Sequence, residues 1–236
     1  MKGYRVSFRR GDGVVIEEGA PDLLRETPIT VLTPWRLPNN HRGQNHQTGL
    51  QYLVRSQSHV PFESRLEQFA VQRLGFDPAV LHVAAQPFLL TWTHENRRVG
   101  HVPDLLALRL GQPPLLIDVK PRAFVMQEPN QVAFSATAAF ARGLGWEYAV
   151  WSEPSTTYLL NLRYLEGFWR VPVDLDVLQP ALLALVRRAP RTIGELAGAL
   201  EPECLVRPVL FHLLWSRELT TDLELMLDDH RILQAS

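Results

Sequence analysis

The chain has 236 residues, which allows one large domain or two small ones. Hydrophobic residues make up 46% and charged residues 21% of the sequence, so a packed core is expected and wholesale disorder is excluded. No apolar run approaches the ~18 residues of a membrane span, no signal-peptide pattern is visible, and the only cysteine, Cys204, cannot form an internal disulfide. We therefore expect no membrane partner and a reducing, cytoplasmic setting.

The net charge of −1 is unevenly distributed along the chain. Residues 1–60 carry eight basic and five acidic residues, whereas residues 172–236 carry six basic and ten acidic residues. Within the first segment, the stretch 27–62 contains no Asp or Glu at all. We interpret residues 1–60 as an N-terminal arm that faces DNA. Its candidate phosphate-binding residues are Arg36, Arg42 and Arg55.

Residues 61–171 have the pattern of an α/β domain. Apolar residues at helical spacing predict a first helix over 63–76, with Gly75 placed where a helix would end. Apolar runs predict strands at 79–94, 101–110, 113–121 and 146–153, and an Ala- and Phe-rich stretch predicts a second helix at 130–144. This order indicates a mixed sheet flanked by helices.

The remaining residues, 172–236, predict a small winged-helix-like α+β domain. Three helical stretches are followed by an alternating stretch typical of a hairpin. Thr192 and Glu195 have the spacing of a helix capping box. Pro208 predicts that the third helix is kinked or begins late.

Four residues are candidates for catalysis: Glu67, Asp104, Asp118 and Lys120. Asp118 and Lys120 are two apart in an otherwise apolar strand, so their side chains should share one face. Asp104 belongs to the preceding strand, and hairpin pairing should bring it near Asp118. Carboxylates that converge in this way are hard oxygen ligands for Mg²⁺ or Mn²⁺.

Lysine itself is informative here, because the chain has 22 Arg and only two Lys. A lysine retained at position 120 indicates a need for a compact ammonium that acts as a point charge or proton donor. The alternative is a surface ion pair at a strand end. Two further candidates are open: Gln86 lies near the site or at a sheet edge, and His101 contacts phosphate or is a structural histidine.

The combination of a helical glutamate, a Pro-Asp pair and a D-x-K triplet resembles the PD-(D/E)xK nuclease superfamily. The flanking segments ESRLE, GFDPAV, QPF, HVPDLLAL and LIDVKP are similar to those of TnsA-like endonuclease subunits of heteromeric transposases, and the resemblance covers about residues 34–170. It implies a restriction-endonuclease-like fold. It also implies that Asp104, Asp118, the Val119 backbone carbonyl and Glu67 bind Mg²⁺, with Lys120 acting on the attacking water or the transition state.

The resemblance also implies a task and partners. A TnsA-like subunit nicks the 5′ ends of a transposon in double-stranded DNA, together with a DDE transposase (TnsB-like) and an AAA+ regulator (TnsC-like). The acidic C-terminal segment would then dock one of these proteins rather than DNA. The alternatives are a stand-alone nuclease of the restriction or repair type and a catalytically silent assembly adaptor.

Overall fold

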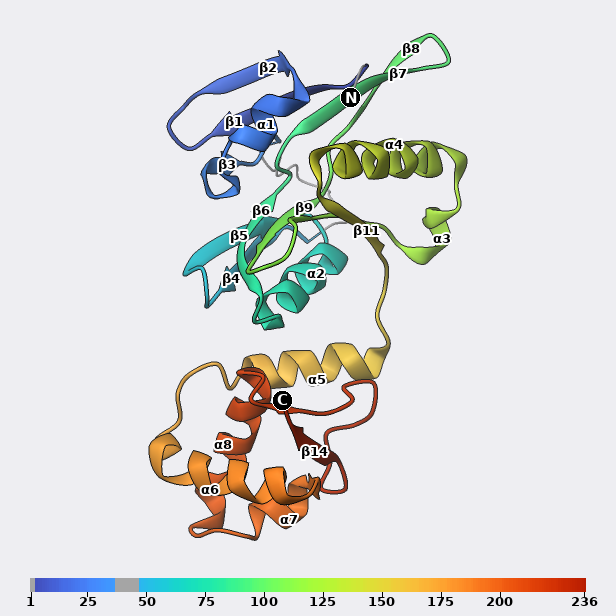
Figure 1. Ribbon diagram of the computed structural model, residues 1–236. Helices are drawn as coiled ribbons and strands as arrows, with labels where there is room; N and C mark the ends of the chain where they lie inside the picture. Colours follow the sequence, from blue (N-terminus) through green and yellow to red (C-terminus); the bar gives the residue numbers. More distant parts are fainter. Residues whose placement is uncertain (1–2, 37–46) are drawn as a thin grey trace. The chain divides into compact units, whose positions relative to one another are not determined.

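The computed structural model describes residues 3–36 and 47–236. The chain divides into two compact units, Met1–Glu153 and Pro154–Ser236, both of which combine helices and strands (Figure 1). None of the helices in the described ranges has the length and apolar character that crossing a bilayer requires.

A mixed four-stranded sheet forms the centre of the first unit. Its strand order is β11-β10-β9-β6, in which β10 and β11 are parallel and the other pairs antiparallel. These strands are β6 (Val80–Ala85), β9 (Leu105–Arg109), β10 (Leu115–Val119) and β11 (Glu147–Trp151). Three helices follow or precede them in the chain: α2 (Arg65–Phe76), α3 (Arg122–Val125) and α4 (Glu128–Leu144).

Alternation along the strands places two apolar cores on the two faces of this sheet. Ile117 of β10 packs with α2, whereas its neighbour Leu116 packs with α4. Both residues are completely buried. The expectation of an α/β fold is confirmed by this arrangement of helices and sheet.

Residues 3–33 are part of the folded unit and do not form the arm that the sequence predicts. They contribute to a second sheet of order β2-β1-β7-β8, in which β3 also pairs with β1. Its elements, with the short helices between them, are β1 (Arg5–Arg10), β2 (Val15–Gly19), α1 (Pro21–Glu26), η1 (Ile29–Val31), β3 (Leu32–Thr33), β7 (Leu89–His94) and β8 (Arg97–His101). Val6 and Phe8 are buried in the core, and the partner of Val6 is Leu90, far along the chain.

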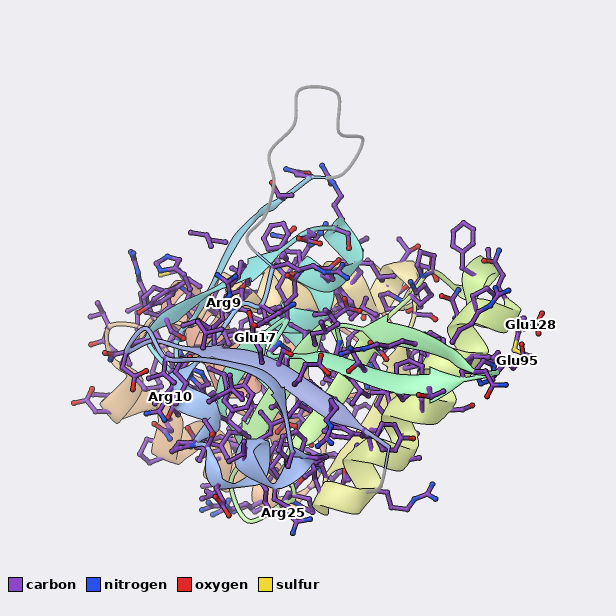
Figure 2. All side chains as sticks on the ribbon, turned by 90° about the horizontal axis from the view of Figure 1, so that it is seen from above. Arg9, Arg10, Glu17, Arg25, Glu95 and Glu128 are labelled. Carbon is purple, nitrogen blue, oxygen red and sulfur yellow. The ribbon has the colours of Figure 1, made fainter. Side chains whose placement is uncertain are left out.

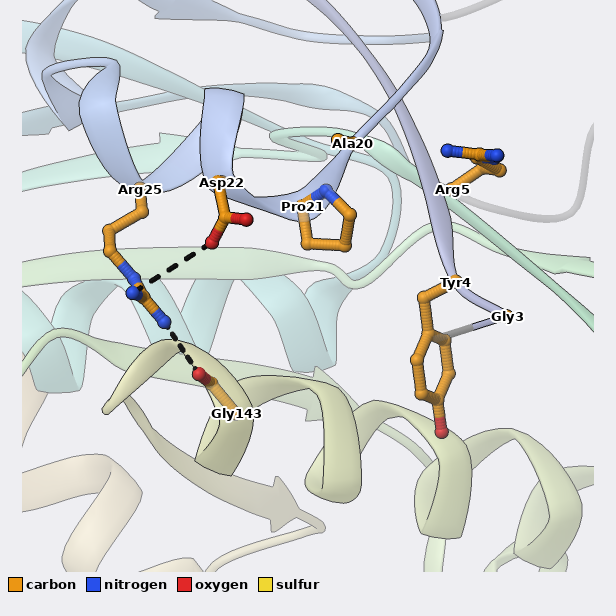
Figure 3. A pocket seen from close by; sticks show the side chains of 8 residues that line it. All are labelled: Gly3, Tyr4, Arg5, Ala20, Pro21, Asp22, Arg25 and Gly143. Carbon is orange, nitrogen blue, oxygen red and sulfur yellow. Dashed lines mark hydrogen bonds and ion pairs between the residues drawn. The ribbon is translucent and has the colours of Figure 1, made fainter. Parts of the chain in front are cut away.

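Contacts between α1 and α4 hold this N-terminal segment against the rest of the unit. Arg25 donates a hydrogen bond of 2.7 Å to the Gly143 carbonyl in the last turn of α4 and also pairs with Asp22 at 3.8 Å (Figure 3). An arginine on the last carbonyls of a helix satisfies acceptors that have no partner within the helix. Together with Tyr4, these side chains line an open hollow of about 560 Å³.

The predicted strand at 79–94 is two strands in two different sheets. The chain turns at Gln86, whose φ of +46° lies in the left-handed region. β6 ends before this residue and β7 begins after it. A run of apolar residues gives no sign of such a break, because both halves are buried.

A two-stranded antiparallel ribbon, β4 (Gly49–Leu53) and β5 (Ser58–Phe62), packs on α2. Gly75 lies inside α2 rather than after its end, because the helix continues to Phe76. A Cβ atom at this position would lie 2.7 Å from Leu53 Cδ2. The glycine is therefore needed for close approach of the ribbon, not for helix termination.

The second unit contains three helices and three short strands after its first helix. Its sheet has the order β12-β14-β13. The elements are α5 (Thr156–Glu166), α6 (Leu175–Arg188), β12 (Arg191–Thr192), α7 (Ile193–Ala197), α8 (Glu203–Trp215), β13 (Leu219–Thr220) and β14 (Ile232–Ala235). The predicted capping box of Thr192 and Glu195 is confirmed, while α8 begins before Pro208 and includes it.

Helix α5 belongs to this second unit, so the boundary lies earlier than residue 172. The Asn161 side chain donates hydrogen bonds to the carbonyls of Leu223 and Leu225 at 2.9 and 2.8 Å. The rings of Tyr164 and Phe211 also pack edge to face, with centroids 5.0 Å apart. These contacts between distant parts of the chain cannot be seen from local periodicity.

Candidate active site

The two central strands bring Asp104 beside the Asp118–Lys120 segment. Asp104 directly precedes β9, and its backbone N–H donates to the Ile117 carbonyl at 3.1 Å. Its carboxylate accepts a 2.6 Å hydrogen bond from the N–H of Val119. The Asp104 side chain thus lies at the end of β10. It contacts Val119, the residue between Asp118 and Lys120.

Three charged side chains lie near enough to Asp104 to change its pKa: Asp118, Glu67 and Lys120. Burial of its carboxyl group and the negative charge of Asp118 raise the pKa of Asp104 well above its usual range. The charge of Glu67 adds to this rise, while the Val119 N–H and the Lys120 ammonium oppose it. We call Glu67, Asp104 and Asp118 the carboxylate cluster; its negative charge exceeds what the single lysine can balance.

Asp118 is held by two side chains that the sequence did not link to it. It is 1% exposed, and its Oδ1 lies 2.8 Å from His101 Nε2. Its Oδ2 accepts a 2.6 Å hydrogen bond from the Tyr148 hydroxyl. Burial and the adjacent Asp118 charge raise the pKa of Tyr148, so this hydroxyl keeps its proton and acts as a donor.

The role of Tyr148 follows from strand register. In the parallel pairing of β10 and β11, Leu116 lies opposite Tyr148 and Asp118 opposite Val150, so Tyr148 and Asp118 project from the same face. His101 comes from the last position of β8 in the other sheet. His101 therefore has a partner in the site, and a structural role is sufficient to explain its burial.

Glu67 is engaged in the N-terminal cap of α2. Its Oε2 accepts from the Glu63 N–H and its Oε1 from the Ser64 hydroxyl, both at 2.8 Å. Ser64 in turn accepts from the Glu67 N–H at 3.1 Å. Ser64 thus caps α2, as its S-x-x-E spacing indicates, but the Glu67 carboxylate accepts from the N–H of Glu63 rather than from that of the cap residue, so the capping box is incomplete. Glu67 nevertheless lies close enough to Asp104 to raise its pKa.

Lys120 follows directly on β10 and is partly buried. Its backbone is fixed by hydrogen bonds to the Trp151 carbonyl and from the Ser152 hydroxyl, at 2.9 and 2.8 Å. Within residues 3–36 and 47–236, its ammonium forms no hydrogen bond or ion pair. A rigid backbone with an uncommitted cationic head is what a group that acts on a substrate requires.

Gln86 joins the site to the N-terminal segment. Its N–H donates to the Asp104 carbonyl at 2.7 Å, and its own carbonyl accepts from the Trp35 N–H at 2.8 Å. The side chain is only 9% exposed, and its buried Oε1 has no hydrogen-bond partner among the described residues. Gln86 thus contacts the backbone of Asp104 in the candidate site. It also lies where the chain passes from β6 in one sheet to β7 in the other.

The donor set of the carboxylate cluster matches Mg²⁺ in chemistry, and its excess negative charge favours a cation. The side chains do not form a ready-made metal site: in the described part of the chain, no group of three or more His, Cys, Asp or Glu side chains is arranged to hold a metal. The oxygens of Asp118 face His101 and Tyr148, and those of Glu67 face the helix cap. Asp118 is close enough for its charge to raise the pKa of Asp104, and the Val119 carbonyl belongs to the residue whose N–H donates to the Asp104 carboxylate.

Two of the three predicted DNA-binding arginines belong to the described residues. Arg36 is exposed after β3, and Arg55 is exposed in the turn between β4 and β5. Arg42 lies outside the described residues.

Comparison with protein-family models finds no match for this chain, and no curated protein is significantly similar to it.

Proposed function

We propose that this chain is a Mg²⁺-dependent DNA endonuclease of the PD-(D/E)xK type, and specifically a TnsA-like subunit that nicks the 5′ ends of a transposon. The observation that carries the proposal is the hydrogen bond of 2.6 Å between the Asp104 carboxylate and the Val119 N–H. It places Asp104 against the D-x-K segment, so that two carboxylates and Lys120 meet at one strand end.

In this proposal Asp104, Asp118 and the Val119 carbonyl hold the cation, which supplies charge neutralisation at the phosphate and lowers the pKa of a bound water. Lys120 places its ammonium beside the reacting phosphate, where it stabilises negative charge that develops in the transition state. His101 and Tyr148 keep the Asp118 carboxylate in one orientation, as partners behind a ligand do. Glu67 adds negative charge to the field while it caps α2.

We further propose that the second unit is a winged-helix-like module that docks a protein. This proposal is supported by the order of α6, α7, α8 and the strands, with β14 between β12 and β13. Residues 154–236 carry eight basic and eleven acidic residues, a net charge of −3. Such a charge opposes binding to a phosphate backbone and suits a basic surface on the DDE transposase or the AAA+ regulator.

A second candidate function is that of a catalytically silent adaptor. It is favoured by one observation: both oxygens of Asp118 are occupied by protein donors. An aspartate that serves only to join β8 to β11 would show the same contacts.

A nicking assay separates these functions. Supercoiled plasmid that carries transposon ends is incubated with Mg²⁺ and the chain, alone or with the transposase and the regulator, and Asp104→Asn serves as the inactive control. Nicking at the ends only with the partners supports the TnsA-like function, and nicking by the chain alone indicates a stand-alone nuclease. Absence of nicking in every mixture, together with no Mg²⁺ binding by calorimetry, would refute the nuclease proposal and leave the adaptor.

A further inference from the structure

The β4–β5 ribbon has one face that the first unit covers and one face that it leaves open. Leu53, Val60 and Phe62 point to the covered face, and each is less than 7% exposed. The residues of the other face alternate with them, as expected of strands. These are Leu50, Tyr52, His59 and Pro61, with Arg55 in the connecting turn.

The open face is apolar and aromatic. Leu50 is 65% exposed and Tyr52 40% exposed. The register pairs Tyr52 with His59, and their rings pack with centroids 5.1 Å apart. Single exposed apolar residues are ordinary, but a contiguous row on one face of an element marks a surface that binds something.

The charge of this segment identifies the kind of partner. At the chain's average of 25 acidic residues in 236, the stretch 27–62 should hold about four, and it holds none. The other exposed sheet of the unit differs: Arg10 pairs with Asp12 at 2.7 Å and Arg98 with Glu18, and carboxylates such as Glu17 lie among the arginines (Figure 2). Arg55 has no such partner in the described ranges. A ribbon that itself has no acidic residue, from Gly49 to Phe62, and that carries an uncommitted arginine favours a polyanion.

The ribbon is also continuous with the candidate active site. β5 ends at Phe62, and the N–H of the next residue, Glu63, donates to the Glu67 carboxylate at 2.8 Å. Five residues per strand give the ribbon a length of about 16 Å. A two-stranded ribbon of this kind fits the major groove of B-DNA, where apolar side chains contact thymine methyl groups and arginine contacts phosphate or guanine.

We propose that the open face of the β4–β5 ribbon binds duplex DNA beside the cleavage site, with Tyr52 and His59 toward the base edges and Arg55 on the backbone. The inference rests on the proposed nuclease function and specifies which surface positions its substrate.

The test measures duplex binding by the full chain through fluorescence anisotropy of a labelled 30-base-pair duplex in EDTA, so that no cleavage contributes. Tyr52→Ala should raise the dissociation constant for the duplex at least about fivefold at ~50 mM salt, because one anchoring aromatic side chain is lost. Arg55→Ala should reduce the slope of log K against log salt by about 0.9, so that wild type loses about threefold more affinity than the variant between 50 and 200 mM salt.

Two matched controls lie in the second unit: Tyr164→Ala, an exposed tyrosine with ring neighbours, and Arg188→Ala, an exposed arginine. Both should bind the duplex like wild type, and all variants should keep the wild-type melting temperature of the first unit. Equal affinity of Tyr52→Ala and wild type would overturn the proposal, as would absence of duplex binding by wild type at ~50 mM salt. Loss of transposase binding with DNA affinity retained would show a protein-binding surface instead.

Failure of this inference is distinguishable from failure of the proposed function. Asp104→Asn should abolish nicking and still bind the duplex in EDTA at least as tightly as wild type, because the ribbon is intact and the carboxylate cluster carries one negative charge fewer. If the ribbon variants weaken duplex binding but the wild-type chain never nicks DNA, the proposed nuclease function is refuted and the DNA-binding surface is retained.

Discussion

Replacing Asp104 with asparagine should make the protein more stable while abolishing Mg²⁺-dependent nicking. The variant keeps a side-chain oxygen for the 2.6 Å hydrogen bond from Val119 and removes one negative charge from the carboxylate cluster. Like charges that shift each other's pKa, as Asp118 shifts that of Asp104, lie within roughly 4–6 Å and repel by about 3–4 kcal/mol at an effective dielectric constant of about 20. Lys120 offsets part of this repulsion, so we expect a gain of about 1–2 kcal/mol in the free energy of unfolding.

The gain should depend on pH in a defined direction. Because the folded-state pKa of Asp104 is raised above its unfolded value, its protonation stabilises the folded state at low pH. This stabilisation is fully present below the unfolded pKa and is lost as pH rises through the folded pKa. The difference between Asp104→Asn and wild type should therefore be largest at neutral pH and should shrink toward pH ~4.

Calorimetry or thermal denaturation without divalent cations measures this effect. For a unit of this size, 1–2 kcal/mol corresponds to an increase of about 2–8 °C in the melting temperature. Asp22→Asn, at an exposed aspartate of α1, is the matched control and should change stability by less than about 0.5 kcal/mol. A variant that melts below wild type at pH 7 and still nicks DNA would refute both the repulsion and the metal assignment.

Other substitutions test the remaining parts of the site and the second unit. Lys120→Arg should reduce the nicking rate nearly as much as Lys120→Ala, because a planar guanidinium does not replace a point ammonium in a confined site; a rate within about threefold of wild type would show that charge alone matters. Tyr148→Phe should lower the free energy of unfolding by about 1–3 kcal/mol in urea, since it leaves an oxygen of buried Asp118 without its donor, and an unchanged midpoint would contradict the hydrogen bond. Gln86→Leu should leave stability unchanged or higher, because it removes a buried oxygen that lacks a partner; a loss above about 1 kcal/mol would count against that assignment. The isolated segment 154–236 should fold, bind the transposase or the regulator in a pull-down, and show no duplex affinity at ~150 mM salt, whereas tight duplex binding would reverse its role.

Local patterns predicted the centre of the first unit well. The strands that carry Asp104 and Asp118 have short apolar runs on either side of a tight turn, and such hairpins form from neighbours in the chain. The sequence therefore sufficed to place Asp104 beside the D-x-K segment. The same applies to the capping box of Thr192, which depends on residues three positions apart.

Contacts between segments that are far apart in the chain could not be predicted from local sequence patterns. The sequence predicts an arm at residues 1–60 because β7, the strand that joins β1 to the rest of the unit, lies some eighty residues further on. Tyr148 could not be assigned to Asp118 before the parallel register of β10 and β11 was known. Nor does periodicity show that Asn161 binds the carbonyl of Leu223. In each case the information resides in the tertiary partner rather than in the local sequence.

The pairing of β1 with β7 has a consequence for the order in which the protein is made. β1 can form a hairpin with β2 at once, but Val6 meets Leu90, so the edge of β1 that pairs with β7 stays open until the ribosome has added more than eighty further residues. At about 5–20 residues per second, that delay is roughly 4–17 s, during which an apolar strand edge is open to other chains. The first unit cannot be completed before β7 has left the exit tunnel. Deletion of the first ten residues would make this exposure permanent along one edge of β7, and we expect such a truncated protein to aggregate during expression rather than merely to lose affinity for DNA.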